Sequence, residues 1–200
     1  MITSDTRVAL LNSTIKMIAE NGLDKTTTKR IATDACMNEV YIYRLFNDKE
    51  DLIKEAFTAL DNELVCNILS QLTAIEEEDA VFESKFRSLF RFCWKYILQN
   101  KEKCLCFIRY YYSPYFTKYS FMEHRKKFEK VIEKIESDFC EDANVWMLLN
   151  HVLNTMFNFA VKVFNGEMED CDGTDEYVYS LVYSSIKPHI KHQPQEVYIH

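Results

Sequence analysis

The side chains best suited to bind a phosphate or a base edge are concentrated between Thr26 and Leu52. Hydroxyl, amide, guanidinium and ammonium groups donate hydrogen bonds to phosphate oxygens, and the same groups reach base edges in a DNA groove. A carboxylate can accept a bond from cytosine. We therefore expect contacts to nucleic acid from nine residues of this stretch: Thr27, Thr28, Lys29, Asn38, Glu39, Tyr41, Tyr43, Arg44 and Lys49.

The first of these residues begin a short predicted helix. Thr27 or Thr28 can cap it, because a threonine oxygen accepts a hydrogen bond from an amide that the first helical turn leaves unpaired. The apolar residues that follow fall on one helical face, at Ile31, Ala32 and Ala35. Residues 36–38 then break the pattern without Gly or Pro, which indicates a tight turn.

A second short helix is predicted over residues 39–45. Asn38 is its expected cap, since a short amide side chain can satisfy the early backbone N–H groups. We expect Val40 to point inward. The side chains expected to point outward, toward a DNA groove, include Tyr41 and Arg44.

A long third helix is predicted from residue 48 to about residue 72. Asn47 followed by Glu50 resembles a capping box with Asn in place of Ser or Thr. Lys49 lies in the first turn, where exposed amides and a cation can hold a phosphate. Thr28 and Lys29 are expected to make backbone contacts that set the register of the protein on DNA.

Two short helices joined by a three-residue turn have the geometry that lets one helix enter the major groove. The stretch also resembles the N-terminal domain of the TetR/AcrR family of transcriptional regulators. The matching positions are Thr27 or Thr28, Ile31, Ala32, Ala35, Tyr41 or Tyr43, Phe46, Lys49 and Leu52. The chain departs from that pattern where Cys36 replaces the usual Gly of the turn and Val40 replaces a small residue. A cysteine there would bear a cost if the turn needs a positive φ.

The composition favours long helices. Apolar residues make up 48% of the 200 residues, and the chain has only three Gly and three Pro. The net charge is −7, but residues 1–50 hold seven basic and seven acidic residues, so the whole excess lies in residues 51–200. We therefore predict an all-α protein of about nine helices, with a neutral DNA-binding domain over residues 1–50 and an acidic helical domain over residues 51–200.

The second domain is predicted to hold a small, largely apolar molecule. Most of the 14% aromatic residues lie after residue 80, and rings at this density line either a bulky core or a cavity. The residues expected to contact the ligand are Trp94, Phe107, Tyr110, Tyr111, Phe128, Asn154 and Phe157.

The last two long helices, over residues 143–165 and 174–187, are too apolar for a solvated surface. An apolar helix pair can meet its symmetry mate in a four-helix contact, and the resemblance implies the same homodimer. Three asparagines repeat every four residues on one face, at Asn150, Asn154 and Asn158. They could lie at a solvent edge, cross a subunit interface or face a pocket.

No other chemistry is indicated. The seven cysteines form no paired framework, and no Gly-rich phosphate loop or nucleophile elbow occurs. Cys104 and Cys106 lack the further ligands that zinc needs. We expect no cofactor, no metal and no enzymatic activity. Without a signal peptide or an apolar spanning run, a cytoplasmic location without membrane contact is expected.

The sequence thus predicts a ligand-responsive, homodimeric DNA-binding repressor that binds a palindromic operator. One alternative is a helical protein-binding module with a degenerate DNA-binding head, which the neutral charge of residues 1–50 favours. Another is a cofactor-independent enzyme that uses the aromatic cavity.

Overall fold

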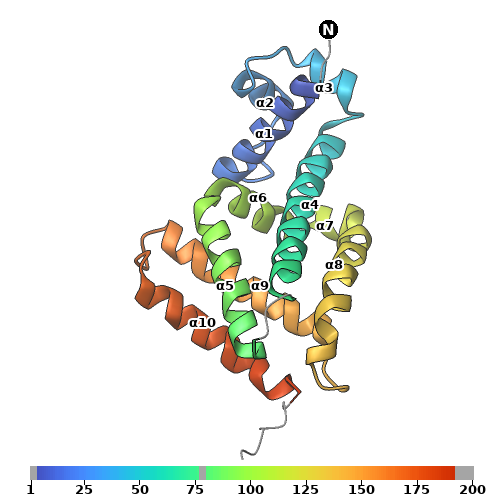
Figure 1. Ribbon diagram of the computed structural model, residues 1–200. Coiled ribbons are helices and arrows are strands. Elements are labelled where there is room, and N and C mark those ends of the chain that lie inside the picture. The colour runs from blue at the N-terminus through green and yellow to red at the C-terminus, as the bar shows by residue number, and fades with distance from the viewer. Residues whose placement is uncertain (1–3, 77–79, 192–200) are drawn as a thin grey trace, which may run out of the picture.

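The computed structural model describes residues 4–76 and 80–191. These residues form ten α-helices and two short 3-10 helices (Figure 1). The first five helices are α1 Ser4–Asn21, α2 Thr28–Asp34, α3 Val40–Leu45, α4 Lys49–Glu76 and α5 Phe82–Gln99. The others are α6 Lys101–Tyr111, α7 Pro114–Tyr119, α8 Phe121–Ile135, η1 Glu136–Asp138, α9 Val145–Phe164, α10 Asp172–Ile186 and η2 Lys187–His189. The described residues contain no β-strand, and the predicted all-α fold is confirmed.

Helices α1, α2 and α3 form a small head at one end of the molecule (Figure 1). Their apolar faces meet in a cluster of buried residues: Leu10, Met17, Ile31, Ala32, Ile42, Phe46 and Leu52. Leu52 lies in the first turn of α4, so the helix that leaves the head also closes its core. The division of the chain at residue 50 stays a prediction.

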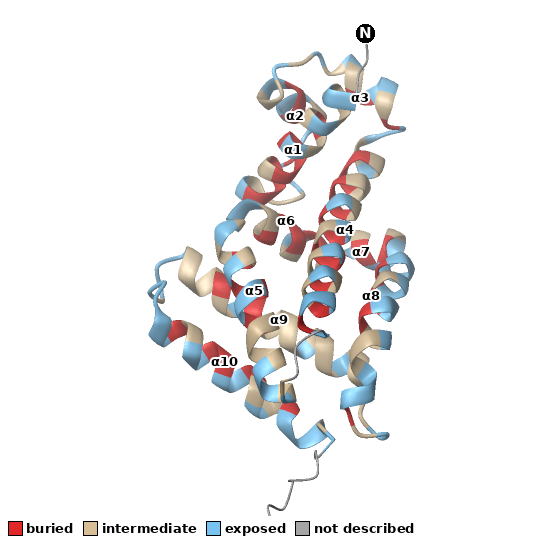
Figure 2. Ribbon diagram, viewed as in Figure 1, coloured by how far each residue is buried: buried red, intermediate tan, exposed pale blue. Residues whose placement is uncertain are grey.

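Helix α4 connects the head to a larger helical body. It has 28 residues, which corresponds to about 42 Å at 1.5 Å per residue. Its buried residues follow one side of the helix, toward the other body helices (Figure 2). Phe57 on that side stacks on Tyr110 with ring centroids 4.4 Å apart and lies 5.1 Å from Phe107. Rings from α4 and α6 therefore form the centre of the body core.

Helix α1 contributes to both cores. Its residues Ile15, Ile18 and Ala19 belong to the body cluster, and α1 packs extensively on α6. Nη1 of Arg109 on α6 donates to the carbonyl oxygen of Ile18 at 2.8 Å. The Ile18 carbonyl also accepts from the Gly22 amide at 2.9 Å, so Arg109 supplies a second bond at the end of α1. Gly22 ends α1 with a φ of 79°, the left-handed conformation that glycine adopts at helix ends.

A buried carboxylate joins α4 to α8. Asp61 is fully buried, and its two oxygens bond to Nδ1 of His124 at 2.7 Å and to Nζ of Lys127 at 2.9 Å. His124 is also buried, and its ring lies 4.6 Å from the ring of Phe128. A buried charge without partners would be very costly, so these bonds make the residue tolerable in the core.

The segment after α6 differs from the sequence prediction. A break at residues 113–115 and a single helix over residues 117–139 were expected, but Pro114 begins the short helix α7 and Ser120 separates it from α8. Proline fits the first position of a helix, because that position needs no amide donor. Helix α8 ends at Ile135, where the chain enters η1.

Helices α9 and α10 pack against each other at the far side of the body. Among the described residues, no helix combines the length and hydropathy needed to cross a membrane.

Candidate nucleic-acid interface and apolar cavity

The start of α2 is tied to α3 by side-chain hydrogen bonds. The Thr27 oxygen accepts from the Arg30 amide at 3.3 Å, which confirms Thr27 as the cap. The Thr28 hydroxyl donates to the Glu39 carboxylate and lies 3.4 Å from the Tyr43 hydroxyl. These contacts fix the two helices relative to each other, while Lys29 stays exposed beside them.

The turn between α2 and α3 has the hydrogen bonds of a Schellman motif. The Met37 amide donates to the Ala32 carbonyl at 2.8 Å, and the Cys36 amide donates to the Thr33 carbonyl at 3.1 Å. This motif requires a left-handed residue after the helix cap, and Cys36 has a φ of 54° there. It is the only non-glycine residue with positive φ in the described chain. Cys36 thus takes a positive φ at the position where the family pattern has Gly.

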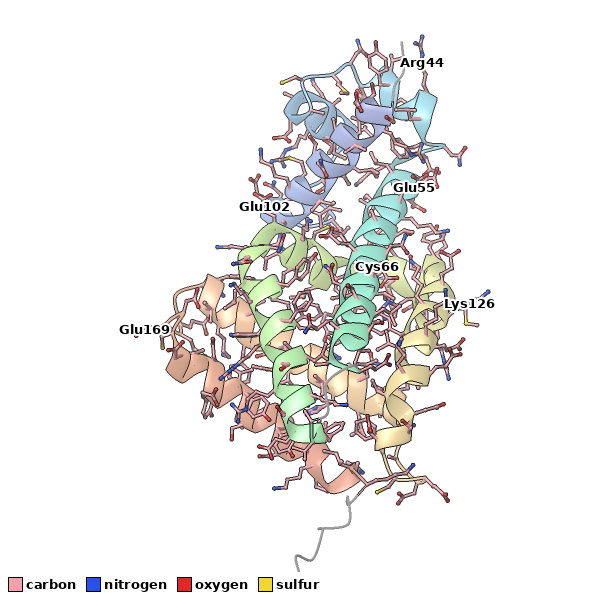
Figure 3. The ribbon with its side chains drawn as sticks, viewed as in Figure 1. Arg44, Glu55, Cys66, Glu102, Lys126 and Glu169 are labelled. Carbon is pink, nitrogen blue, oxygen red and sulfur yellow. The ribbon has the colours of Figure 1, made fainter. Side chains whose placement is uncertain are left out.

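Helix α3 presents three neighbouring side chains to solvent. Val40 is 50% exposed, Tyr43 is 57% exposed, and Arg44 extends from the outer end of the head (Figure 3). Residues three and four apart share a helix face, so these three side chains form one surface. The prediction that Val40 points inward is wrong, because Ile42 is the fully buried residue of the helix. Val40 is therefore a surface residue that sequence reasoning missed as a contact candidate.

Two further residues that were predicted to contact DNA are held by contacts within the head. Tyr41 is partly buried and packs against the head core. Asn38 is exposed, and its Oδ1 accepts from the Val40 amide at 2.9 Å, so it caps α3 as predicted.

The start of α4 is capped differently from the prediction. The Asp51 amide donates to Oδ1 of Asp48 at 2.8 Å, and the Asn47 amide donates to Oδ2 of Asp51 at 3.1 Å. Asp48 therefore caps the helix, which begins at Lys49, and the Asp51 carboxylate accepts from Asn47; the predicted pair of Asn47 and Glu50 does not form. Lys49 is partly buried, and its Nζ lies 3.5 Å from the Leu23 carbonyl.

One acidic residue of the head is neutralised by an ion pair. Nζ of Lys16 on α1 lies 2.6 Å from Oδ1 of Asp34 on α2. The hydrogen bond from Lys16 lowers the pKa of Asp34 below its usual value. The pair also links the two helices. Because Asp34 is paired with Lys16, it does not compete with a phosphate for the exposed side chains of Lys29 and Arg44.

The body contains a cavity of about 340 Å³ between α4, α5, α8, α9 and the end of α10. Most of its wall is apolar, from residues such as Ile68, Leu72, Phe90, Val131, Leu153 and Met156. None of the seven predicted ligand contacts lines it. Trp94, Phe107, Tyr110, Phe128 and Phe157 are buried in the body core instead.

Tyr111 and Asn154 also lie outside this cavity, in polar contacts between helices. The Tyr111 hydroxyl donates to Asn150 at 3.0 Å, and the Tyr112 hydroxyl donates to Asn154 at 3.0 Å. The regularly spaced asparagines of α9 thus bond to tyrosines at the end of α6, while Asn158 is exposed.

The polar groups of the cavity gather at one end. They belong to the end of α4, the second turn of α5 and the junction of α8 with η1: Glu76, Lys85, Lys134, Ser137 and Asp138. Nζ of Lys134 bonds to both carboxylate oxygens of Glu76, at 2.8 and 2.9 Å. Burial raises the pKa of Asp138 above its usual value. No sequence motif marks this end, since its residues come from separate helices.

The α9–α10 surface exposes large apolar side chains. Met147 is 63% exposed, Tyr177 is 55% exposed and Leu181 is 40% exposed. The Tyr177 ring packs edge-on against Phe159, with centroids 6.0 Å apart. Exposed apolar side chains on two adjacent helices are typical of protein–protein contact surfaces.

In the described chain, no group of three or more His, Cys, Asp or Glu side chains is arranged to hold a metal ion.

Residues 10–56 match the family model of bacterial regulatory proteins, tetR family. A comparison with curated protein sequences finds no match. A TetR family transcription regulator from Marinobacter aquaeolei VT8 has a similar structure, with a TM-score of 0.75 and 16% identity over 90% of this chain and 94% of that chain. A putative tetR family regulator from Shewanella sp. PV-4 has a TM-score of 0.74 and 15% identity, over 90% and 96% of the two chains.

A putative TetR family transcriptional regulator from Vibrio parahaemolyticus is 20% identical, with a TM-score of 0.69 over 94% of this chain and all of that chain. These proteins are described as transcription regulators, which agrees with the expectation that this chain is not an enzyme. The head thus matches the tetR family model in sequence, and the fold of the whole chain is that of solved TetR-family transcription regulators.

Proposed function

We propose that the protein is a homodimeric repressor that binds a palindromic operator and is released by a small, largely apolar ligand. The observation that carries the proposal is the exposed face of α3, formed by Val40, Tyr43 and Arg44 next to the start of α2. A short helix that is held in the second position of a helix-turn-helix and exposes polar and cationic side chains can enter a major groove.

The side chains of this face have different proposed roles. Arg44 can bond to a guanine edge or to a phosphate, and the Val40 side chain can contact a thymine methyl group. Tyr43, Asn38 and Glu39 lie close enough to contribute at the same groove. Phosphate contacts that fix the register come from Thr27, Thr28 and Lys29 at the start of α2, from Tyr41 on α3 and from Lys49 at the start of α4.

Dimerisation through α9 and α10 would place two heads on one operator. The proposal is supported by the exposed apolar side chains Met147, Tyr177 and Leu181 on these helices. A two-fold dimer reads two half-sites that lie about 34–36 Å apart, or a multiple of that distance. Residues 1–50 would then act as the DNA-binding domain, and residues 51–200 as the ligand-binding and dimerisation domain.

The cavity between α4 and α8 is the proposed effector site. Its volume of about 340 Å³ lies within the range of small-molecule pockets, roughly 300–1,000 Å³. Helix α4 lines it at Ile68 and Leu72 and closes the head core at Leu52. A ligand that binds more tightly to a conformation unable to fit DNA would release the operator. We also propose a cytoplasmic location, supported by seven free cysteines.

DNA selection with the purified protein, followed by titration of the selected site at two salt concentrations, tests the proposal. We expect a palindromic site whose affinity falls as salt rises. Arg44→Ala should weaken binding at least tenfold. Lys126→Ala removes the same charge from an exposed position on α8, away from the head (Figure 3), and should leave the affinity within twofold.

A well-folded dimer that enriches no DNA sequence would refute the repressor hypothesis. Equal losses for Arg44→Ala and Lys126→Ala would mean that α3 is not the contacting helix. The alternative of a protein-binding module with a degenerate head is favoured by the neutral charge of residues 1–50. It predicts no salt-dependent affinity for any DNA.

A further inference from the structure

The inner end of the cavity is purely apolar. Its wall is formed by Ile68, Leu72, Phe90, Cys93 and Met156, each at most 8% exposed. Burial raises the pKa of the Cys93 thiol to about 12, so this group stays neutral. A polar group of a ligand would lose its bonds to water here without gaining new ones. The part of the ligand that enters this end must therefore be hydrocarbon.

The outer end of the cavity carries two lysines and two acidic residues, but their charges are not equally available. Lys134 and Glu76 neutralise each other through two hydrogen bonds, at 2.8 and 2.9 Å. Lys85 is partly buried in the cavity wall and makes no ion pair with any residue in the described ranges. Asp138 also faces this end of the cavity, but within the described residues it makes no ion pair with Lys85.

The unpaired Lys85 at this end of the cavity favours one kind of ligand head group over the others. A cationic head would meet the unpaired Lys85 ammonium, and like charges at close range repel each other. A neutral head would leave the Lys85 ammonium without a partner. An anionic head can accept charge-assisted hydrogen bonds from Lys85 while its hydrocarbon part fills the inner end.

We infer that the cavity binds an amphipathic anion, a single hydrocarbon chain with a carboxylate or similar head, and that Lys85 determines this specificity. The inference rests on the proposed function of the cavity as the effector site. The volume of about 340 Å³ suits one slender chain and places a bulkier head at the mouth.

The test uses three probes with the same chain and different heads: decanoate, decanol and decylamine, each below its aggregation threshold at neutral pH. Binding to the full-length protein is measured by calorimetry. We expect decanoate to bind about five- to tenfold more tightly than decanol, because one partly exposed charge-assisted bond gives a preference of this order. Decylamine should bind most weakly.

Two matched variants test the role of Lys85. Lys85→Met should reduce the affinity for decanoate to that for decanol and leave decanol binding unchanged. Lys95→Met removes the same charge from an exposed position on the same helix, outside the cavity, and should change neither affinity. Leu153→Trp fills the cavity and should abolish binding of both probes, which excludes adsorption elsewhere.

Each contrary outcome would overturn one part of the inference about the cavity. Equal affinities for decanoate and decanol, or no effect of Lys85→Met, would overturn the assignment of an anionic head. Binding that survives Leu153→Trp, or no binding of any probe, would overturn the cavity as an amphiphile site. Decanoate that binds as expected but leaves operator affinity unchanged would refute the effector role and leave the ligand class intact.

Discussion

Replacing Cys36 by glycine should stabilise the protein. Cys36 holds the left-handed position of the turn between α2 and α3, with a φ of 54°. An L-residue in this conformation brings its Cβ close to a carbonyl oxygen, and glycine has no Cβ. The bonds of the turn come from the backbone, from Met37 to Ala32 and from Cys36 to Thr33, so the substitution leaves them in place.

The magnitude follows from two opposing contributions. The left-handed conformation costs a non-glycine residue about 1–2 kcal/mol. Glycine in turn loses more conformational freedom on folding, about 0.5–1 kcal/mol. The Cys36 side chain is exposed, so its removal leaves no cavity. We expect a net gain of about 1 kcal/mol in the free energy of unfolding, or roughly 2–4 °C in Tm for a chain of this length.

Urea and thermal unfolding of Cys36→Gly, Cys36→Ala and the wild type, at equal protein concentration, measure the effect. Alanine keeps the Cβ and removes the thiol, so Cys36→Ala should match the wild type. If alanine stabilises as much as glycine, the effect comes from the thiol rather than from the backbone. If glycine destabilises the protein, the reasoning about the turn is refuted.

Three further predictions concern the core, an ion pair and the thiols. Asp61→Ala should lower the free energy of unfolding by about 3 kcal/mol in urea, because it leaves His124 and Lys127 without their buried partner; a loss below about 1 kcal/mol would contradict this. Asp34→Asn should make the Tm of the protein fall less steeply as the pH is lowered into the acid range. The folded pKa of Asp34 is lowered by Lys16, so its stabilisation is present above the unfolded pKa of about 4 and is lost as the pH falls through the folded value; unchanged curves would exclude the pair. A thiol reagent should leave three buried cysteines of the native protein unmodified and should react with them only on unfolding: Cys93, Cys104 and Cys106.

The sequence was most informative where local chemistry determines the backbone. The scarcity of Gly and Pro and the apolar spacing predicted the helices, and Thr27 and Asn38 predicted where α2 and α3 begin. Each of these signals acts within a few residues, so it does not depend on distant parts of the chain.

The orientation of α3 and the cavity depend on contacts that are distant in sequence. Val40 and Ile42 are both β-branched and apolar, and only packing against α1 and α2 decides that Ile42 is the buried one. The rings chosen as ligand contacts pack against one another in the core, as Phe107 and Phe157 do. Spacing alone does not separate a ring in a packed core from a ring on a cavity wall. The role of the seven predicted residues in ligand contact stays a prediction.

Because α1 belongs to two cores, the head is not a portable module. Residues Ile15, Ile18 and Ala19 on α1 pack in the body, and Arg109 of α6 bonds to the Ile18 carbonyl. A chimaera that joins this head to the body of another protein of this fold would expose apolar surface and lose the bond from Arg109. A successful exchange of heads would have to transfer the contacting face of α6 together with α1. The segment to be exchanged therefore extends well beyond the helices of the head.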